Sequence, residues 1–366
     1  MHLGQNESFL FVKFCVKTVI PFVLITKDIG LQRLHKFVCD SPAHRPNCNT
    51  RVSVMEQPLP PHGACLLGSF NLVKYIYPSY NTDEAAYKLD IEDLIKDIYP
   101  IVAMMDNVID NTIYPLKEQE AEAKSKRRMG LGITGLANTC EILGYKYGSE
   151  EMIRFMSDIM TIIRDEVYRS SIKLAKIKGS FPVFDKDKYL ESNFIKTLPE
   201  DIKNSIKEYG IRNSHLLSIA PTGTISLFAG NISSGIEPPF SLEYDRRTLM
   251  PDGSVAWWNV MDYAWDVYNK AGKTSEELSA DEHINVLIAA SKLVDSACSK
   301  TCNVGNNVTF DEFKELYMKA YEGGASGCTT FRPASIEERG QVLRVKEVES
   351  NVCFIDPETG ERTCAD

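Results

Sequence analysis

The sequence lacks an extended stripe of basic residues. Its 366 residues include 41 Lys and Arg against 50 Asp and Glu, which gives a net charge of −9, and the two signs are interleaved along the chain. Recognition of a phosphate backbone requires a concentrated basic surface. We therefore expect no nucleic-acid partner.

An uninterrupted apolar run of membrane-spanning length is also missing. The most apolar stretch, residues 8–26, is broken by Lys13, Lys17 and Pro21. Charges inside a bilayer are costly, and no small-residue cleavage site of a secretory signal follows. We expect no membrane partner and a poorly structured leader over residues 1–55.

The cysteines show neither a disulfide framework nor a zinc pattern. All 10 are irregularly spaced, and without a secretory signal they indicate reduced thiols in a cytoplasmic protein. Cys298 and Cys302 are four positions apart, a spacing that would place both on one face of a helix, and Cys328 follows. No fourth ligand stands at a zinc spacing. We expect buried structural thiols and no metal site.

Apolar periodicity predicts long helices separated by short strands. The chain is 43% hydrophobic, enough for a large core, and it shows neither repeats nor a long linker. Runs at residues 215–220 and 224–228 are expected to be buried strands. The expected helices are residues 91–109 with a kink at Pro100, residues 150–178 between the caps Ser149 and Gly179, and a helix running through Val294 from the capping box Ser279–Glu282. Helices alternating with strands indicate an α/β fold.

A glycine pattern in the segment RRMGLGITG suggests a dinucleotide site only weakly. Gly130, Gly132 and Gly135 match the GxGxxG spacing, but no strand precedes them and no acidic residue follows at the distance of a ribose ligand. A nicotinamide dehydrogenase is therefore disfavoured. We expect glycines that let a helix pack closely.

Two other segments leave their alternatives open. Small and hydroxyl residues at a strand end can present N–H groups and hydroxyls to a phosphate, although such a turn is often only a turn. They are Pro221, Thr222, Gly223, Thr224, Ile225 and Ser226. Cys353 and Cys364 lie in a polar terminus, where they are either a mobile dithiol or two incidental surface cysteines.

From Glu56 to Asp366 the sequence resembles the catalytic (large) subunit of ribonucleotide reductases. The matching segments are EQPLPPHGACLLGSFNL, YPLKEQEAEAKSKRRMGLGITGLA, SIAPTGTISLFAGNISSGIEPPFS, DSACSKT and GCTTFRP, in this order. Two features resemble the adenosylcobalamin-dependent class of this family. One is the segment PTGTIS followed by SSGIEP, and the other is the final matching segment, CTTFRP, which lacks the paired tyrosines of the radical-relay class. The resemblance implies the second half of a ten-stranded α/β barrel over residues 56–345 and a mobile redox tail over 346–366.

The same resemblance implies a reaction and its residues. Ribonucleotides would be reduced to deoxyribonucleotides by thiyl-radical chemistry, with adenosylcobalamin as cofactor. Glu56 would be the catalytic carboxylate and Cys65 one of two reducing thiols. Residues 221–226 would hold the substrate phosphates. Cys353 and Cys364 would re-reduce the active-site disulfide with electrons from a thioredoxin- or glutaredoxin-like protein.

One departure from the family falls on the radical cysteine. The family has Asn-Pro-Cys-Gly before the glutamate, whereas this chain has Val52, Ser53, Val54 and Met55. Val54 occupies the position of the radical cysteine and has no thiol to oxidise. Residues 1–55 do not resemble the family. A broken reading frame, an intron that is translated or a gene that is split at this motif would leave such a leader. We expect activity only with a complementary N-terminal reductase fragment; the alternative is a non-catalytic remnant or binding module.

Overall fold

The structure is a computed structural model, and it describes residues 56–79, 86–250, 252–305 and 308–332. It also places the backbone of four short strands outside these ranges: β1 (Phe11–Val12), β10 (Leu343–Val345), β11 (Cys353–Ile355) and β12 (Arg362–Cys364). The rest of the expected leader and of the expected tail lies outside the described residues. Val54 is among these undescribed positions.

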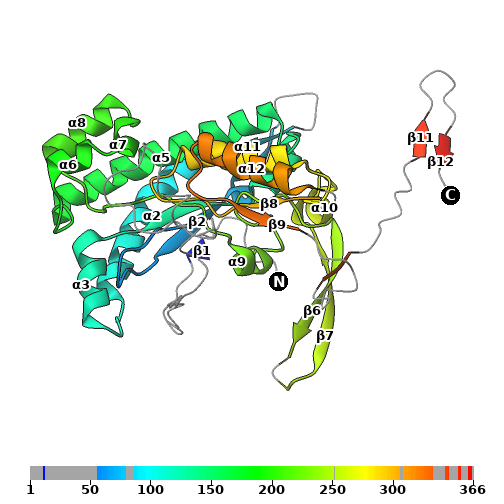
Figure 1. The fold of residues 1–366 in the computed structure, drawn as a ribbon, viewed down its shortest axis with the longest axis horizontal. Helices are drawn as coiled ribbons and strands as arrows, with labels where there is room; N and C mark the ends of the chain where they lie inside the picture. Colours follow the sequence, from blue (N-terminus) through cyan, green and yellow to red (C-terminus); the bar gives the residue numbers. More distant parts are fainter. Residues whose placement is uncertain are drawn as a thin grey trace.

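Parallel chain segments lie side by side through the centre of the molecule (Figure 1). β2 (Leu67–Asn71) pairs with β5 (Gly130–Thr134), and β5 is bridged through Leu131 to Leu217 in the segment 216–219. Ile219 is bridged to Cys298. The chain then continues into β8 (Thr301–Asn303), which pairs in parallel with β9 (Thr329–Phe331). The described residues do not close this array into a barrel.

Four helices pack in sequence along the array. They are α2 (Ile91–Asn111), α5 (Glu150–Lys178), α11 (Ala280–Ser291) and α12 (Phe310–Glu322), and α5 contacts both α2 and α11. The expected caps are present: Ser149 accepts from the Met152 N–H at 3.2 Å, and Ser279 with Glu282 forms a capping box. The helices predicted from periodicity and capping are confirmed, and with the parallel strands they make a mixed α/β fold.

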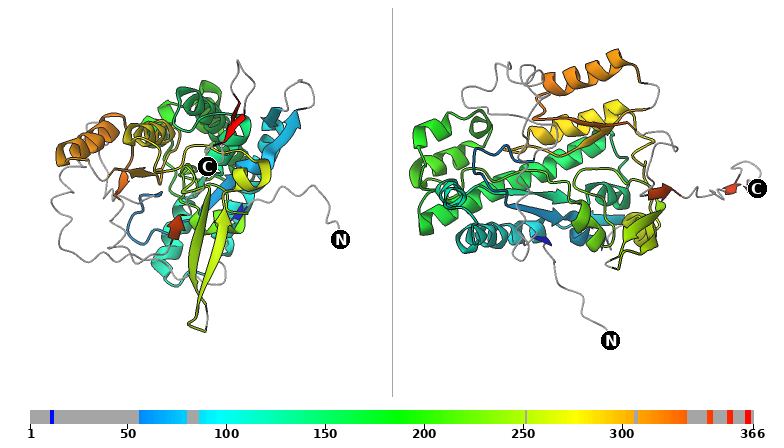
Figure 2. Two further views of the ribbon diagram at one scale, coloured as in Figure 1. Left: turned by 90° about the vertical axis from the view of Figure 1, so that its right-hand side faces the viewer. Right: turned by 60° about the horizontal axis from the view of Figure 1, so that its bottom comes forward.

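The remaining elements are shorter and lie around this central unit. They are η1 (Leu72–Tyr75), β3 (Ile76–Ser79), β4 (Ala86–Leu89), α3 (Lys117–Lys126), α4 (Leu136–Leu143), α6 (Lys186–Leu190), α7 (Asn193–Lys196), α8 (Glu200–Tyr209), α9 (Gly223–Phe228), β6 (Glu243–Leu249), β7 (Val255–Met261) and α10 (Tyr263–Tyr268). β6 and β7 form a hairpin that extends out of the body in Figure 2. Among the described helices, none combines the length and the apolar character needed to cross a bilayer.

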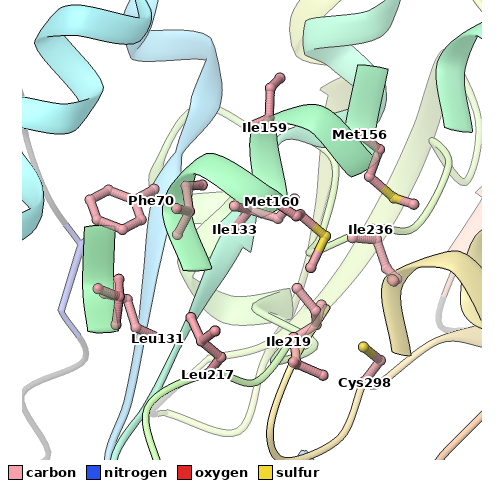
Figure 3. Packing of buried hydrophobic residues seen from close by; sticks show 14 of the residues in the cluster. Phe70, Leu131, Ile133, Met156, Ile159, Met160, Leu217, Ile219, Ile236 and Cys298 are labelled. Atoms are coloured by element: carbon pink, nitrogen blue, oxygen red, sulfur yellow. The ribbon is translucent and has the colours of Figure 1, made fainter. Parts of the chain in front are cut away.

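The main core lies between the parallel segments and α5. Figure 3 shows Leu131, Ile133, Leu217 and Ile219 packed with methionine and isoleucine side chains of α5. The α5 residues labelled there are Met156, Ile159 and Met160. Fully burying an aliphatic side chain of this size stabilises a fold by about 1.5–3 kcal/mol. This contact therefore holds the array against its longest helix.

Asp295 fixes the middle segment of the array to the segment that follows it. Its carboxylate accepts from the backbone N–H groups of Leu216 and Leu217 at 2.8 and 3.0 Å, and from the Tyr168 hydroxyl at 2.8 Å. Burial raises the pKa of Asp295 to about 6, although these donors favour the charged form. One buried carboxylate thus orients the backbone directly before the segment 221–226.

Three local expectations are wrong. Residues 224–228 belong to helix α9, with Phe228 78% exposed, and are not a buried strand. Cys298 and Cys302 lie on an extended segment and share no helical face, although both are buried as expected. Gly130 and Gly132 lie within β5 itself, where a Cβ at either position would collide with Ser218, so they allow close approach of a parallel segment and not of a helix.

Candidate functional site

Glu56 and Cys65 lie near each other at the amino end of the parallel array, where the charge of Glu56 acts on the Cys65 thiol. The carbonyl oxygen of Glu56 accepts from the Ala297 N–H at 2.9 Å, which ties the loop to the segment leading into β8. Cys65 precedes β2, and as a residue it is exposed. Its Sγ donates to the side-chain Oε1 of Gln57 at 3.2 Å. Two residues predicted from the family resemblance thus share one site.

The environment of the site keeps the thiol protonated. Neighbouring protein atoms partly desolvate the thiol although the residue keeps an exposed surface, and this desolvation, followed by the charge of Glu56, raises the pKa of Cys65 to about 12 against the opposing effect of Arg128. Burial also raises the pKa of the Glu56 carboxyl group. Near neutral pH the sulfur therefore carries its hydrogen and can donate it, and the raised pKa makes the Glu56 carboxylate a stronger proton acceptor than an ordinary glutamate.

Gln57 and Arg128 are the functional-site residues that sequence reasoning missed. Gln57 is directly next to Glu56, and Arg128 lies in the segment that leads into β5, so proximity in sequence to a predicted site was the available signal. Burial lowers the pKa of Arg128, and the charge of Asp295, followed by those of Glu122 and Cys65, opposes this effect. It is the cation that acts on this thiol among the described residues.

The predicted phosphate loop, residues 221–226, is built around Thr222. This residue takes a left-handed backbone conformation with φ 55° directly before α9. Its Oγ1 lies 2.8 Å from that of Thr134 and accepts from the Gly235 N–H at 2.7 Å. Ser226 is also buried, and its hydroxyl donates to the Gly223 carbonyl oxygen at 3.0 Å. The side chains of Thr222 and Ser226 therefore hold the loop in shape.

The outward face of the loop is formed by its other residues. Pro221, Gly223 and Thr224 are exposed, and Ile225 is partly buried. The first N–H groups of a helix have no intrahelical partner, so Gly223 to Ile225 present backbone donors to solvent. Because the loop follows the carboxyl end of its segment whereas Cys65 precedes β2, a ligand that reaches both has to extend along the array.

The tail cysteines face each other across a pair of backbone strands. β11 pairs with β12 in an antiparallel sense, and the Cα atom of Cys353 is the partner of the Cα atom of Cys364. Opposite residues in such a pair have Cα atoms about 4.5–5.5 Å apart, and this range lies within what a disulfide spans. The intervening residues 356–361 lie outside the described part of the chain.

Within the described residues, no group of three or more His, Cys, Asp or Glu side chains is arranged to hold a metal ion. Lys300 Nζ donates to Glu237 Oε2 at 2.6 Å and lies 2.9 Å from His283 Nδ1. His283 is therefore engaged in a buried ion-pair network.

Comparison with known proteins identifies relatives over most of the chain. The family model described as "Ribonucleotide reductase, barrel domain" matches residues 53–262 and 255–331. A vitamin B12-dependent ribonucleoside-diphosphate reductase of Mycobacterium tuberculosis is 30% identical over 314 residues, covering 79% of this chain and 42% of the relative. The enzyme of the same description from Thermoplasma acidophilum is 27% identical over 345 residues, covering 87% and 41%. A ribonucleoside-diphosphate reductase subunit alpha of Chlamydia pneumoniae is 31% identical over 213 residues, covering 52% and 20%.

Proposed function

The chain belongs to the ribonucleotide reductase large-subunit family, and we propose that it is the C-terminal part of a reductase that makes deoxyribonucleotides together with a separate N-terminal part. It spans about 42% of the length of the M. tuberculosis relative. The single observation that carries the proposal is the joint placement of Glu56 and Cys65, since the Glu56 charge acts on a thiol held in its protonated form.

The parallel array supports an assignment to the second half of a ten-stranded barrel. Its segments follow one another through β2, β5, residues 216–219, β8 and β9, each in parallel with the next. In this proposal residues 56–345 form the half-barrel, residues 1–55 a leader and residues 346–366 the redox tail. The outer edge of β2 is paired with β1, and in this proposal the complementary fragment would replace β1 there with the other strands.

The proposed chemistry assigns a proton to Glu56 and electrons to Cys65. A thiyl radical removes the 3′ hydrogen of the ribonucleotide, and Glu56 accepts the proton of the 3′ hydroxyl. Cys65 and a second thiol each give up one hydrogen as the 2′ hydroxyl leaves as water, and the two sulfurs become a disulfide. The N–H groups of Gly223, Thr224 and Ile225 would bind the substrate phosphates. The backbone donors and the partial positive charge at the N-terminus of a helix favour anions.

The cofactor proposal rests on the names of the B12-dependent relatives. Adenosylcobalamin would supply the radical, which has to be passed to a cysteine thiol. This chain by itself does not fit that use, because Val54 occupies the position where the thiol is expected. We therefore place both the cofactor's contact and the radical cysteine with the complementary fragment. The proposed setting is the cytoplasm, with a thioredoxin- or glutaredoxin-like reductant.

Reconstitution tests this function. The purified chain alone should not reduce ribonucleotides with adenosylcobalamin and dithiothreitol. Co-expression with an N-terminal reductase fragment that ends in Asn-Pro-Cys-Gly should raise the soluble yield and produce turnover. Cys65→Ser should abolish that turnover, while Cys140→Ala, which changes a buried thiol of α4, should retain it.

Two results would contradict the proposal. Turnover by the chain alone would show that Val54 does not remove the radical step. A soluble complex that binds ribonucleotides without turnover would support the alternative, a binding module that keeps the fold; the loss of the thiol at Val54 is the observation that favours it.

A further inference from the structure

Gln57 lies between the thiol of Cys65 and the strand β5. The residue is 2% exposed, and its Oε1 accepts the Cys65 thiol hydrogen with a sulfur–oxygen distance of 3.2 Å. It is the polar partner of that sulfur among the described hydrogen bonds. The direction of the S–H bond is therefore set by one buried amide.

The other end of the same amide has no partner. Gln57 Nε2 is buried without a hydrogen bond in the described structure, and so is the Ser218 hydroxyl. Both atoms occupy the space that a Cβ of residue 130 would fill, and a Cβ there would lie 2.5 Å from Gln57 Nε2. Gly130 thus makes the room in which the Gln57 side chain is held.

This arrangement is costly for stability. A buried amide donor without a partner loses its hydration and gains no bond in return. A methionine of similar shape would fill the same volume without that cost. Packing therefore does not explain a glutamine at this position, and its one side-chain hydrogen bond in the described structure leads to the sulfur of the candidate site.

We propose that Gln57 is a positioning residue for Cys65: the Oε1 atom of Gln57 accepts the thiol hydrogen and so fixes the direction of the S–H bond. Its importance for the reaction rests on the function proposed above, in which Cys65 donates a hydrogen. The charged groups that act on this sulfur are Glu56 from the same loop and Arg128 ahead of β5. Gln57 adds a neutral acceptor, which favours the thiol over the thiolate.

Site-resolved alkylation of the full chain measures this effect without any turnover. Iodoacetamide reacts with the thiolate, so its rate at Cys65, followed by peptide mass spectrometry from pH 7 to 10, reports the thiolate fraction. Gln57→Met removes the acceptor and should speed alkylation at a given pH by about two- to tenfold, the factor expected for one ordinary hydrogen bond. Gln57→Glu keeps an acceptor but adds a negative charge, and should slow it.

Matched variants separate positioning from packing. Ser218→Ala changes a neighbour that makes no described bond to Cys65 and should leave the Cys65 rate at the wild-type value. The melting temperature of Gln57→Met should equal or exceed that of the wild type. If Gln57→Met melts lower and Cys65 reacts at an unchanged rate, or if both Gln57 variants shift the rate in the same direction, Gln57 only fills space and the proposal fails.

The reconstituted enzyme distinguishes this inference from the proposed function. In an active assembly, Gln57→Met should lower kcat and leave KM unchanged, because a misdirected thiol does not alter phosphate binding. An assembly in which even the wild type shows no turnover overturns the proposed function, while the alkylation result still decides the role of Gln57.

Discussion

Asn138 donates through one amide nitrogen to both carboxylate oxygens of Asp262, at 2.8 Å each, and to Glu141 Oε2 at 2.9 Å. All three side chains are buried. The other oxygen of Glu141, Oε1, has no partner within the described structure. A neutral amide is thus shared by two acids, and burial, followed by the Asp262 charge, raises the pKa of Glu141 to about 8.

The first prediction concerns pH and Glu141→Gln. The folded-state pKa of about 8 lies above the ordinary value of 4.5, so the folded state holds this proton more tightly. The stabilisation is complete below about pH 4.5 and is lost as pH rises through 8. The variant, which is always neutral, should gain about 1–3 kcal/mol relative to wild type between pH 5 and 9. Urea unfolding of both proteins at pH 5 and at pH 9 measures the difference in the free energy of unfolding.

Glu151→Gln is the control for this experiment. Glu151 is exposed in the first turn of α5, so its removal should not reproduce the gain at high pH. Equal pH profiles for wild type and Glu141→Gln would show that Glu141 is ionised in the folded protein without cost.

The second prediction is that Arg127→Met strongly destabilises the fold. The Arg127 guanidinium donates to Asp106 and to Asp110, both at 2.7 Å, and Asp106 is fully buried. Asp106 would keep only its longer ion pairs with Arg212 at 3.2 Å and Lys178 at 3.3 Å, so the loss should be about 3 kcal/mol, the lower end of the range for breaking a buried pair. Chemical denaturation at neutral pH measures the loss. Lys124→Ala, which breaks an exposed pair with Glu120, should cost only about 0.3–0.5 kcal/mol, and an equal loss for both variants would contradict the assignment.

The third prediction separates the two faces of the loop 221–226. Thr222→Val removes the hydroxyl that contacts Thr134 and the Gly235 N–H, and should cost about 1–3 kcal/mol. It should also weaken nucleotide binding, because the loop loses its shape. Thr224→Val alters an exposed side chain and should leave the unfolding free energy within about 0.5 kcal/mol. Thermal unfolding and nucleotide titration of both variants measure these effects; equal losses would contradict the division of roles.

How far the sequence predicted the fold depended on local chemistry. The long helices were predictable because their caps are encoded in nearby residues: Ser149 and Gly179 bound α5, and the pair Ser279–Glu282 opens α11. The run at 224–228 was mistaken for a strand because five apolar and hydroxyl residues show no period. Its helix depends on the distant partners Thr134 and Gly235 of Thr222.

For the site, the resemblance pointed to Glu56 and Cys65, and in the structure the charge of Glu56 contributes to the raised pKa of the Cys65 thiol. It did not predict Gln57, because a side-chain amide carries no signal of its orientation in sequence. Arg128 was not predicted because it ends the charged run EAEAKSKRR, in which no single residue is distinguished from its neighbours. The register of Cys353 with Cys364 also depends on backbone pairing that composition does not reveal.

The fourth prediction concerns this tail pair. Mild oxidation should join Cys353 to Cys364 with loss of two hydrogens, because their Cα atoms are direct partners across β11 and β12. In the reconstituted enzyme, Cys353→Ser with Cys364→Ser should abolish turnover driven by thioredoxin and spare turnover driven by small dithiols, which reach the active site directly. Peptide mass spectrometry and activity assays measure the two effects. Thr363→Ser on β12 is the matched control, and full thioredoxin-driven activity of the double variant would exclude a shuttle.

The separation of the parallel segments along the chain bears on how the protein folds. β8 and β9 are joined through α12 alone, whereas pairing of Leu131 with Leu217 has to close a loop that contains α5 and four further helices. Closing long loops carries an entropy cost before any contact repays it, so arrays of this kind fold slowly. The β8–α12–β9 unit should therefore gain protection from hydrogen exchange first. The amides that pair β5 with the segment 216–219 should gain it last. During that interval the apolar faces of β2 and β5 are open to other chains, which makes refolding yield dependent on protein concentration.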